Sequence, residues 1–246
     1  MKILRLYLKQ RFKPVIFGAL TLLLILFSVA HSLTNSQVFL FILPVFLFLG
    51  MLRLYDDLMN YQVDVAKPNR IYTQPKSRNL LALILAGFAF FCSLVLFLLH
   101  PISAGVLVSF LVLNDLMYRL LFNRGIWRHF LPLFKYPMVV GFLYFLSTAQ
   151  FSSLEITGLM VSIFCAFIVF EQLDDTHFPI ARKYKGLFAN LSLIALLIAF
   201  IDLQFWWVSI AVLVSGNLVV RLNHKSTPYL FLAFVLVSKL VLETLA

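Results

Sequence analysis

Residues 79–99 read NLLALILAGFAFFCSLVLFLL, a run of 21 residues without a charged side chain. A helix needs roughly 20 consecutive apolar residues to cross the hydrocarbon core of a bilayer. A helix also satisfies its own backbone hydrogen bonds in lipid, which an isolated strand cannot do. The run therefore predicts a transmembrane helix.

The rest of the chain repeats this pattern. Hydrophobic residues make up 62% of its 246 residues and charged residues only 12%, whereas soluble domains are about 45–50% apolar. Further apolar runs lie at 12–31, 37–55, 102–121, 129–149, 155–173, 186–201, 204–222 and 227–245. We therefore expect an all-α, polytopic membrane protein: a bundle of about nine transmembrane helices, with residues 1–246 as a single domain in contact with membrane lipid.

The basic residues predict the orientation, because Lys and Arg favour cytoplasmic loops. With nine spans, all the basic groups between spans fall on one side of the membrane. They are Lys2, Arg5, Lys9, Arg11 and Lys13; Lys67, Arg70, Lys76 and Arg78; Arg119, Arg124 and Arg128; Arg182, Lys183 and Lys185; and Arg221 and Lys225. We expect an integral protein of the cell (inner) membrane with a cytoplasmic N-terminus. The net charge of +10 follows from topology, so no nucleic-acid partner is expected.

Six of the ten acidic residues gather at the ends of two predicted spans. The first group is Asp56, Asp57 and Asp64, with Asn60 between them, and Asp57, Asn60 and Asp64 share one face if the helix continues. The second group is Glu171, Asp174 and Asp175. The tendency of basic residues to face the cytoplasm does not call for such acidic clusters, so we interpret them as functional.

Clustered carboxylates require a cation, because two unit charges about 4 Å apart cost on the order of 4 kcal/mol at an effective dielectric of about 20. Mg²⁺ suits these oxygen ligands and is often shared with substrate phosphates. Basic residues of the same loops can hold a diphosphate. An apolar bundle beneath them would accept a lipid tail. The pattern therefore predicts a cytoplasmic site for a lipid diphosphate.

The two acidic stretches resemble the aspartate-rich motifs of the UbiA superfamily of intramembrane prenyltransferases. The first family motif, N/D-D-x-x-D-x-x-x-D, is similar to Asp56-Asp57-Leu-Met-Asn60-Tyr-Gln-Val-Asp64, and Pro68-Asn69-Arg70 resembles the Pro-x-Arg that follows it. The second, D-x-x-x-D, is similar to Glu171-Gln-Leu-Asp174-Asp175. Asn60 and Glu171 stand where the family has Asp, and both keep an oxygen ligand.

The resemblance implies a Mg²⁺-dependent transfer of a polyprenyl group from its diphosphate to a small acceptor, often an aromatic quinone precursor. It implies catalytic roles for Asp57, Asp64 and Asp175. The implied metal ligands are Asp56, Asp57, Asn60, Asp64, Glu171, Asp174 and Asp175. The residues implied to bind the diphosphate are Arg70, Lys67, Tyr118, Arg124, Lys183 and Lys185.

Two other readings stay open: a non-catalytic relative that binds a prenyl lipid, and a multi-pass transporter, in which charges line a path through the bilayer. Four further residues carry smaller expectations. Asp115 either serves the site or bonds a neighbouring helix. Lys135 is expected to extend to the interface rather than to reach the pocket, and Lys239 and Glu243 are spaced for an ion pair.

Overall fold

A computed structural model of the chain describes residues 2–28, 35–65, 70–99, 101–121, 125–148, 154–174, 178–200, 206–222 and 224–245. The described residues are mostly helical and contain no strand, which confirms the all-α part of the predicted fold class. The long helices are α2 (Pro14–Ser28), α3 (Asn35–Met59), α5 (Pro75–Leu99), α6 (Pro101–Leu121), α7 (Trp127–Thr148), α8 (Leu154–Asp174), α9 (Lys185–Ala199), α10 (Trp206–Arg221) and α11 (Thr227–Leu245). Each coincides with one predicted apolar run.

Five helices in the described part of the chain are long and apolar enough to cross a membrane: α5, α6, α7, α8 and α11. The count is six if α1 (Lys2–Arg11) and α2, which meet at a bend of 71°, form one broken span. The chain is therefore a membrane protein. The predicted number of nine spans is not confirmed, because α9 and α10 are shorter than a full span and α3 is not among the candidate spans in the described part of the chain.

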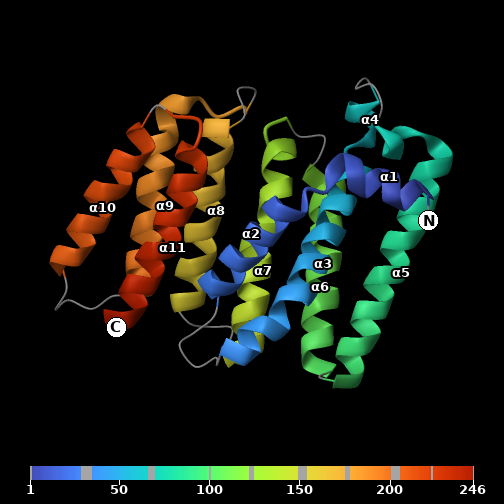
Figure 1. Ribbon diagram of the computed structural model, residues 1–246, viewed down its shortest axis with the longest axis horizontal. Helices are drawn as coiled ribbons and strands as arrows, with labels where there is room; N and C mark the ends of the chain where they lie inside the picture. The colour runs from blue at the N-terminus through green and yellow to red at the C-terminus, as the bar shows by residue number, and fades with distance from the viewer. Residues whose placement is uncertain are drawn as a thin grey trace. The chain divides into compact units, whose positions relative to one another are not determined.

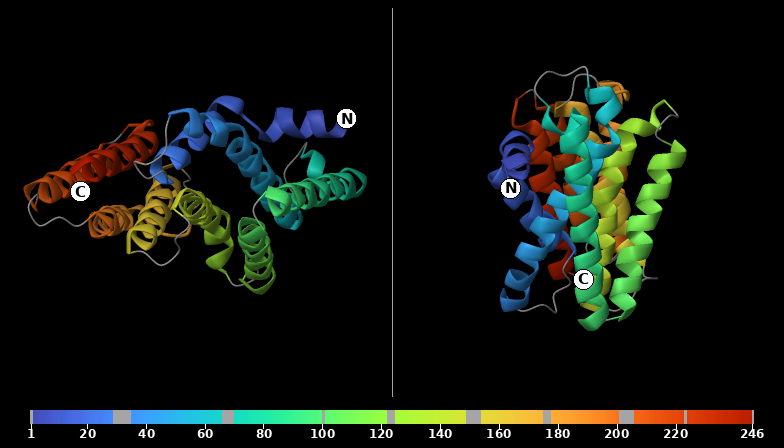
Figure 2. Two further views of the ribbon diagram at one scale, coloured as in Figure 1. Left: turned by 90° about the horizontal axis from the view of Figure 1, so that it is seen from below. Right: turned by 90° about the vertical axis from the view of Figure 1, so that its right-hand side faces the viewer.

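The predicted elements do not include α1 as a separate helix, and Pro14 explains why α1 ends before α2 begins. Proline disfavours a helical conformation in the residue before it and suits the first position of a new helix. The basic N-terminal stretch therefore forms a helix that ends at Arg11, and α2 begins at Pro14. Figures 1 and 2 show α1 running crosswise to the long helices α3 and α5.

The helices form two compact units, one of residues 1–22 and 35–118 and the other of residues 23–34 and 119–246. In the first unit, α3 packs against α5, and α1 packs against α5 and the short helix η1 (Ile71–Thr73). Tyr7, Leu54, Tyr72 and Leu81 form a buried cluster there. In the second unit, α8 contacts α7, α9 and α11.

Small residues allow α8 and α9 to approach closely in the second unit. Gly158, Ser162 and Ala166 follow one another at intervals of four along α8 and are all buried. The Ser192 hydroxyl of α9 donates a hydrogen bond to the Ser162 carbonyl at 2.8 Å. Small side chains are typical of such contacts in membranes, where they let helix backbones pack together.

Gly158→Val is expected to destabilise this contact. A Cβ at Gly158 would lie 2.6 Å from the Ala195 carbonyl oxygen and 2.8 Å from the Ala199 Cβ, and overpacking of this kind costs roughly 1–3 kcal/mol. The thermal unfolding midpoint in detergent should fall. Gly105→Val is the matched control, because a Cβ there meets nothing within 4 Å. Equal midpoints for the two variants would show that the close α8–α9 contact is not formed.

Candidate functional site

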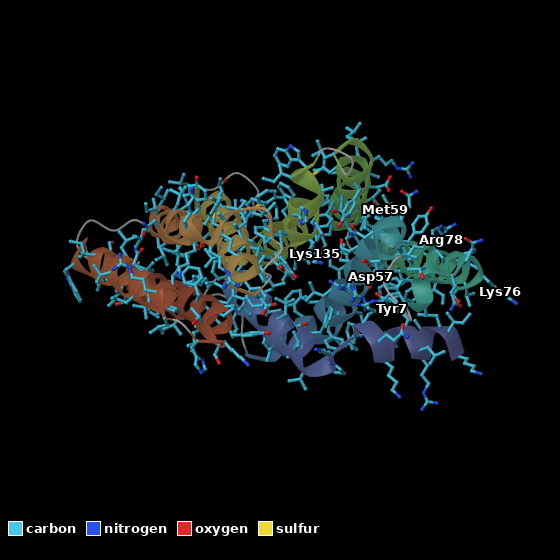
Figure 3. All side chains as sticks on the ribbon, turned by 90° about the horizontal axis from the view of Figure 1, so that it is seen from above. Tyr7, Asp57, Met59, Lys76, Arg78 and Lys135 are labelled. Atoms are coloured by element: carbon cyan, nitrogen blue, oxygen red, sulfur yellow. The ribbon has the colours of Figure 1, made fainter. Side chains whose placement is uncertain are left out.

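Asp57 lies buried near the end of α3, where two residues of α1 hold its carboxylate. Arg11 donates through Nε to Oδ2 at 2.9 Å and through Nη2 to Oδ1 at 2.6 Å, and the Tyr7 hydroxyl donates to Oδ2 at 2.9 Å. Arg53, one turn earlier in α3, lies 3.5 Å from Oδ1. Figure 3 shows Tyr7 and Asp57 together at this point. Paired, charge-assisted hydrogen bonds of this kind fix geometry as well as charge.

Asp56 faces a different helix. The Tyr118 hydroxyl of α6 donates to Oδ1 of Asp56 at 2.5 Å, and both side chains are buried. Beside this pair, the Tyr55 hydroxyl donates to Asp115 at 2.8 Å, and the Tyr55 and Tyr118 rings meet edge to face. Asp115 therefore bonds a neighbouring helix, which is one of its two expected roles, and it lies next to the Asp56–Tyr118 pair.

Asp64 ends the short helix α4 (Tyr61–Asp64), where the Tyr72 hydroxyl donates to its Oδ2 at 2.5 Å. Burial and this hydrogen bond raise the pKa of Tyr72, so Tyr72 keeps its proton and acts as a donor. Asn60 lies between the two helices, and its side-chain amide donates to the Asp56 carbonyl at 2.8 Å. The helix is therefore interrupted at Asn60, so Asp57, Asn60 and Asp64 do not share the face of one continuous helix. Asp56, Asp57 and Asp64 are nevertheless buried, at only 5%, 3% and 6% exposed.

The described basic residues that follow Asp64 are Arg70, Lys76 and Arg78; Lys76 is exposed and the other two are half-buried. Arg70 is half-buried just before η1, and the Thr73 hydroxyl donates to its carbonyl at 2.7 Å. The guanidinium carbon of Arg78 lies 4.0 Å from the centre of the Tyr61 ring, a cation–π distance. A hydrogen bond from Gln62 and the charge of Arg78 lower the pKa of Tyr61. Lys76 and Arg78 lie on the first turn of α5 (Figure 3).

The second acidic group lies at the end of α8 in the other unit. Glu171 is half-buried and Asp174 is exposed. Arg182 donates to the carbonyls of Gln172 at 3.1 Å and Leu173 at 3.3 Å, so a basic side chain satisfies the last carbonyl groups of the helix. Lys183 is exposed, with its Nζ 5.0 Å from the Tyr184 ring centre, and Lys185 is half-buried at the first position of α9.

Three predicted site residues, Lys67, Arg124 and Asp175, lie outside the described residues. Among the side chains that are described, no three His, Cys, Asp or Glu residues lie close enough together to hold a metal ion. The donor chemistry of Asp56, Asn60 and Asp64 fits Mg²⁺, which takes oxygen ligands. Asp57 fits less well, because Arg11 and Tyr7 already bond both of its oxygens.

The sequence interpretation missed the partners of the acidic residues. Arg11 was assigned to topology, and Tyr7 and Tyr72 were not singled out. The spacing of Tyr7 and Arg11, four residues apart, is the signal that could have marked a shared helix face. Lys135 is buried within the protein, at only 6% exposed, and its Nζ lies 5.3 Å from the Tyr136 ring centre. The Lys239–Glu243 ion pair is confirmed at 2.6 Å.

Comparisons with protein families, with curated proteins and with solved structures find no match for this chain.

Proposed function

We propose that the chain is a UbiA-type intramembrane prenyltransferase that moves a polyprenyl group from its diphosphate to a small acceptor in a Mg²⁺-dependent reaction. The observation that carries the proposal is the burial of Asp56 and Asp57 at the end of α3, and of Asp64 in the short helix α4 that follows, in a membrane protein. Buried carboxylates are costly unless they are paired, and ionisable groups in membrane bundles are functional candidates by default.

The three aspartates are held by tyrosines from three different elements: Tyr118 of α6, Tyr7 of α1 and Tyr72 of η1. Outer hydrogen bonds of this kind orient metal-binding carboxylates and influence metal affinity. Tyr118 and Tyr72 therefore act as positioning residues for Asp56 and Asp64.

The proposed Mg²⁺ ligands are Asp56, Asn60 and Asp64, joined by Glu171, Asp174 and Asp175 of the second motif, with Asp57 available only if Arg11 moves away. When bound, Mg²⁺ would neutralise charge on the departing diphosphate. Lys67, Arg70, Arg124, Lys183 and Lys185 would bind the diphosphate oxygens, since Lys and Arg form charge-assisted hydrogen bonds with phosphate. Cleavage of the allylic C–O bond would leave the electron pair on the diphosphate, and the acceptor would attack the resulting allylic cation and then lose a proton.

The proposal includes nine spans with a cytoplasmic N-terminus. The agreement between the nine predicted apolar runs and α2, α3 and α5–α11 supports this count. The confinement of Lys and Arg to alternate connections supports the orientation. Both acidic stretches then belong to the cytoplasmic side.

One observation favours a second candidate, a relative that binds a prenyl lipid without catalysis. Arg11 and Tyr7 bond both oxygens of Asp57, and a guanidinium in this position supplies the positive charge that Mg²⁺ would otherwise supply. The transporter alternative has weaker support, because the carboxylates of both motifs lie at helix ends rather than along a helix.

Incubation of the purified full chain with radiolabelled farnesyl diphosphate tests the proposal, with a panel of aromatic acceptors, in the presence and absence of EDTA. We expect release of diphosphate and formation of a prenylated product, both abolished by EDTA and restored by excess Mg²⁺. Binding of the diphosphate without product under any condition would favour the non-catalytic relative. Turnover that survives EDTA would contradict the metal site.

A further inference from the structure

The helix α1 presents three faces, because residues four apart follow one another along the same side of a helix. Tyr7 and Arg11 form the face that is bonded to Asp57. Leu4 and Leu8, continued by Phe12 directly after the helix, form the apolar face, which is the next one around the helix axis. Arg5 and Lys9 form the third face, Lys13 follows in the connection to α2, and all three are exposed. The apolar face therefore lies between the buried face and a basic stripe, which we define as Arg5, Lys9 and Lys13.

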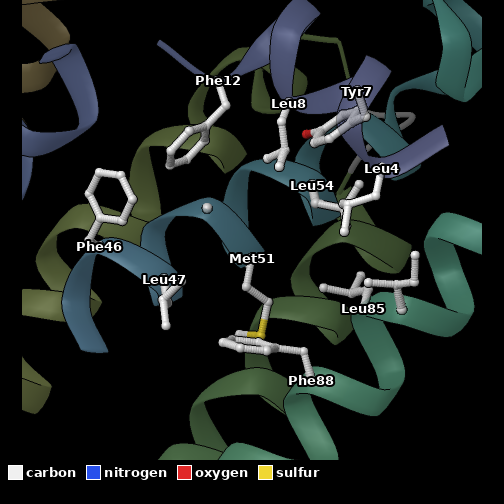
Figure 4. Close-up of a pocket in the computed structure, with 12 residues that line it drawn as sticks. Leu4, Tyr7, Leu8, Phe12, Phe46, Leu47, Met51, Leu54, Leu85 and Phe88 are labelled. Atoms are coloured by element: carbon white, nitrogen blue, oxygen red, sulfur yellow. The ribbon is translucent and has the colours of Figure 1, made fainter. Parts of the chain in front are cut away.

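The apolar face covers a cavity of about 300 Å³ within the first unit, at the lower end of the range of ligand-sized pockets. Figure 4 shows the cavity between α1, α3 and α5, lined by apolar side chains that include Phe12, Met51 and Phe88. Leu8 and Leu47, at 41% and 43% exposed, also line it, so the cavity opens to the outside.

The cavity lies on the apolar side of the acidic cluster. Met51 and Leu54 of its lining precede Asp57 in α3 by six and three residues, which places them roughly 9 and 5 Å away along the helix. The α5 side of the lining, Ile84 to Phe88, lies within a candidate membrane span. An acyl chain of the surrounding bilayer has the chemistry to fill such a space.

No acidic residue lies next to the basic stripe along the chain, since residues 2–13 read KILRLYLKQRFK. A helix with an apolar face and a basic face binds at the surface of an anionic membrane. The opposite face of α1 is bonded to Asp57 through Tyr7 and Arg11. These bonds fix the orientation of the basic stripe in the absence of lipid.

We propose that the cavity and the basic stripe together bind an anionic membrane phospholipid, with one acyl chain in the cavity and the headgroup phosphate against Arg5, Lys9 and Lys13. A phosphodiester headgroup needs only basic partners. A diphosphate that is to be ionised also needs a divalent cation, and α1 carries no carboxylate to hold one. The proposal does not rest on prenyl transfer.

Thermal unfolding of the purified full chain in a non-ionic detergent tests the headgroup contact, with added phosphatidylglycerol or phosphatidylcholine of the same acyl chains. We expect phosphatidylglycerol to raise the midpoint of the native chain more than phosphatidylcholine does. The triple variant R5Q/K9Q/K13Q should bind phosphatidylglycerol about a hundredfold more weakly, since each basic residue near an anionic surface contributes about fivefold. The matched control R119Q/R221Q/K225Q removes three exposed charges elsewhere and should keep the preference.

A second pair of variants tests the acyl-chain contact. Leu47→Trp fills the cavity, and its control Leu43→Trp lies one turn earlier in α3 at 64% exposure, outside the lining. The phosphatidylglycerol effect should be lost in Leu47→Trp and kept in Leu43→Trp. Equal effects of the two lipids on the native chain, or an undiminished preference in the triple variant or in Leu47→Trp, would overturn the proposal. Displacement of phosphatidylglycerol from the native chain by geranylgeranyl diphosphate would also overturn it, because the cavity would then be a substrate site.

Discussion

Replacing Asp64 by Asn is expected to lower Mg²⁺-dependent diphosphate release about 10²- to 10³-fold while the protein stays folded. Asn has nearly the same shape and accepts the Tyr72 hydrogen bond, but it lacks the charge that would attract Mg²⁺. Removal of one electrostatic group that stabilises a transition state costs about this much. The measurement is the initial rate with radiolabelled farnesyl diphosphate at saturating Mg²⁺.

Tyr72→Phe is expected to lower the rate of diphosphate release less than Asp64→Asn does. It removes only the donor to Asp64, and loss of a residue that orients a metal ligand costs about 10- to 100-fold. The apparent affinity for Mg²⁺ should fall with the rate. Glu155→Gln is the matched control, because it makes the same change in a carboxylate that binds Tyr144 outside both motifs. Equal rates for Asp64→Asn and Glu155→Gln would contradict a catalytic role for Asp64.

Replacing Asp57 by Ala is expected to release α1 from the first unit. Arg11, with 16% of its side chain exposed, would lose its bidentate partner. Removal of one member of a buried ion pair costs about 3–5 kcal/mol, because the other charge is left without compensation. Amide hydrogen exchange in residues 2–11 should accelerate on the order of 10²- to 10³-fold, measured by mass spectrometry in detergent.

The double variant Arg11→Met/Asp57→Leu separates charge from packing. Both charges are gone, and replacement of a buried pair by apolar residues is often neutral, so slow exchange in α1 should return in large part. Exchange in α8 serves as an internal control, because α8 belongs to the other unit. If α1 exchanges in Asp57→Ala as slowly as in the native chain, Arg11 and Tyr7 do not hold the helix.

The helix positions could be predicted because apolar runs and their charged boundaries are local properties. The run at 102–121, for example, became α6 at Pro101–Leu121. The break between α1 and α2 is also local, and Pro14 signals it, but the basic residues around it were interpreted only as topology. The number of helices that span the membrane is a different question, since length and composition alone support five or six.

The partners of the acidic residues could not be predicted in the same way. Tyr7 lies 50 positions from Asp57, and Tyr118 lies 62 positions from Asp56. Helical periodicity relates residues within a few turns and carries no information about such distant pairs. The repulsion between clustered carboxylates calls for a cation, and the sequence interpretation assigned that role to Mg²⁺. It did not foresee that Arg11 of the same chain provides one at Asp57.

The proposed function requires both acidic stretches to serve one Mg²⁺-diphosphate site, and a distance measurement tests this most directly. Spin labels would be attached at Gln62→Cys and Ala181→Cys, both exposed positions, after replacement of Cys92 and Cys165. Because Mg²⁺–oxygen bonds are only about 2 Å long, we predict labels within about 20 Å of each other. A separation of about 30 Å or more, the thickness of the hydrocarbon core, would contradict a shared site.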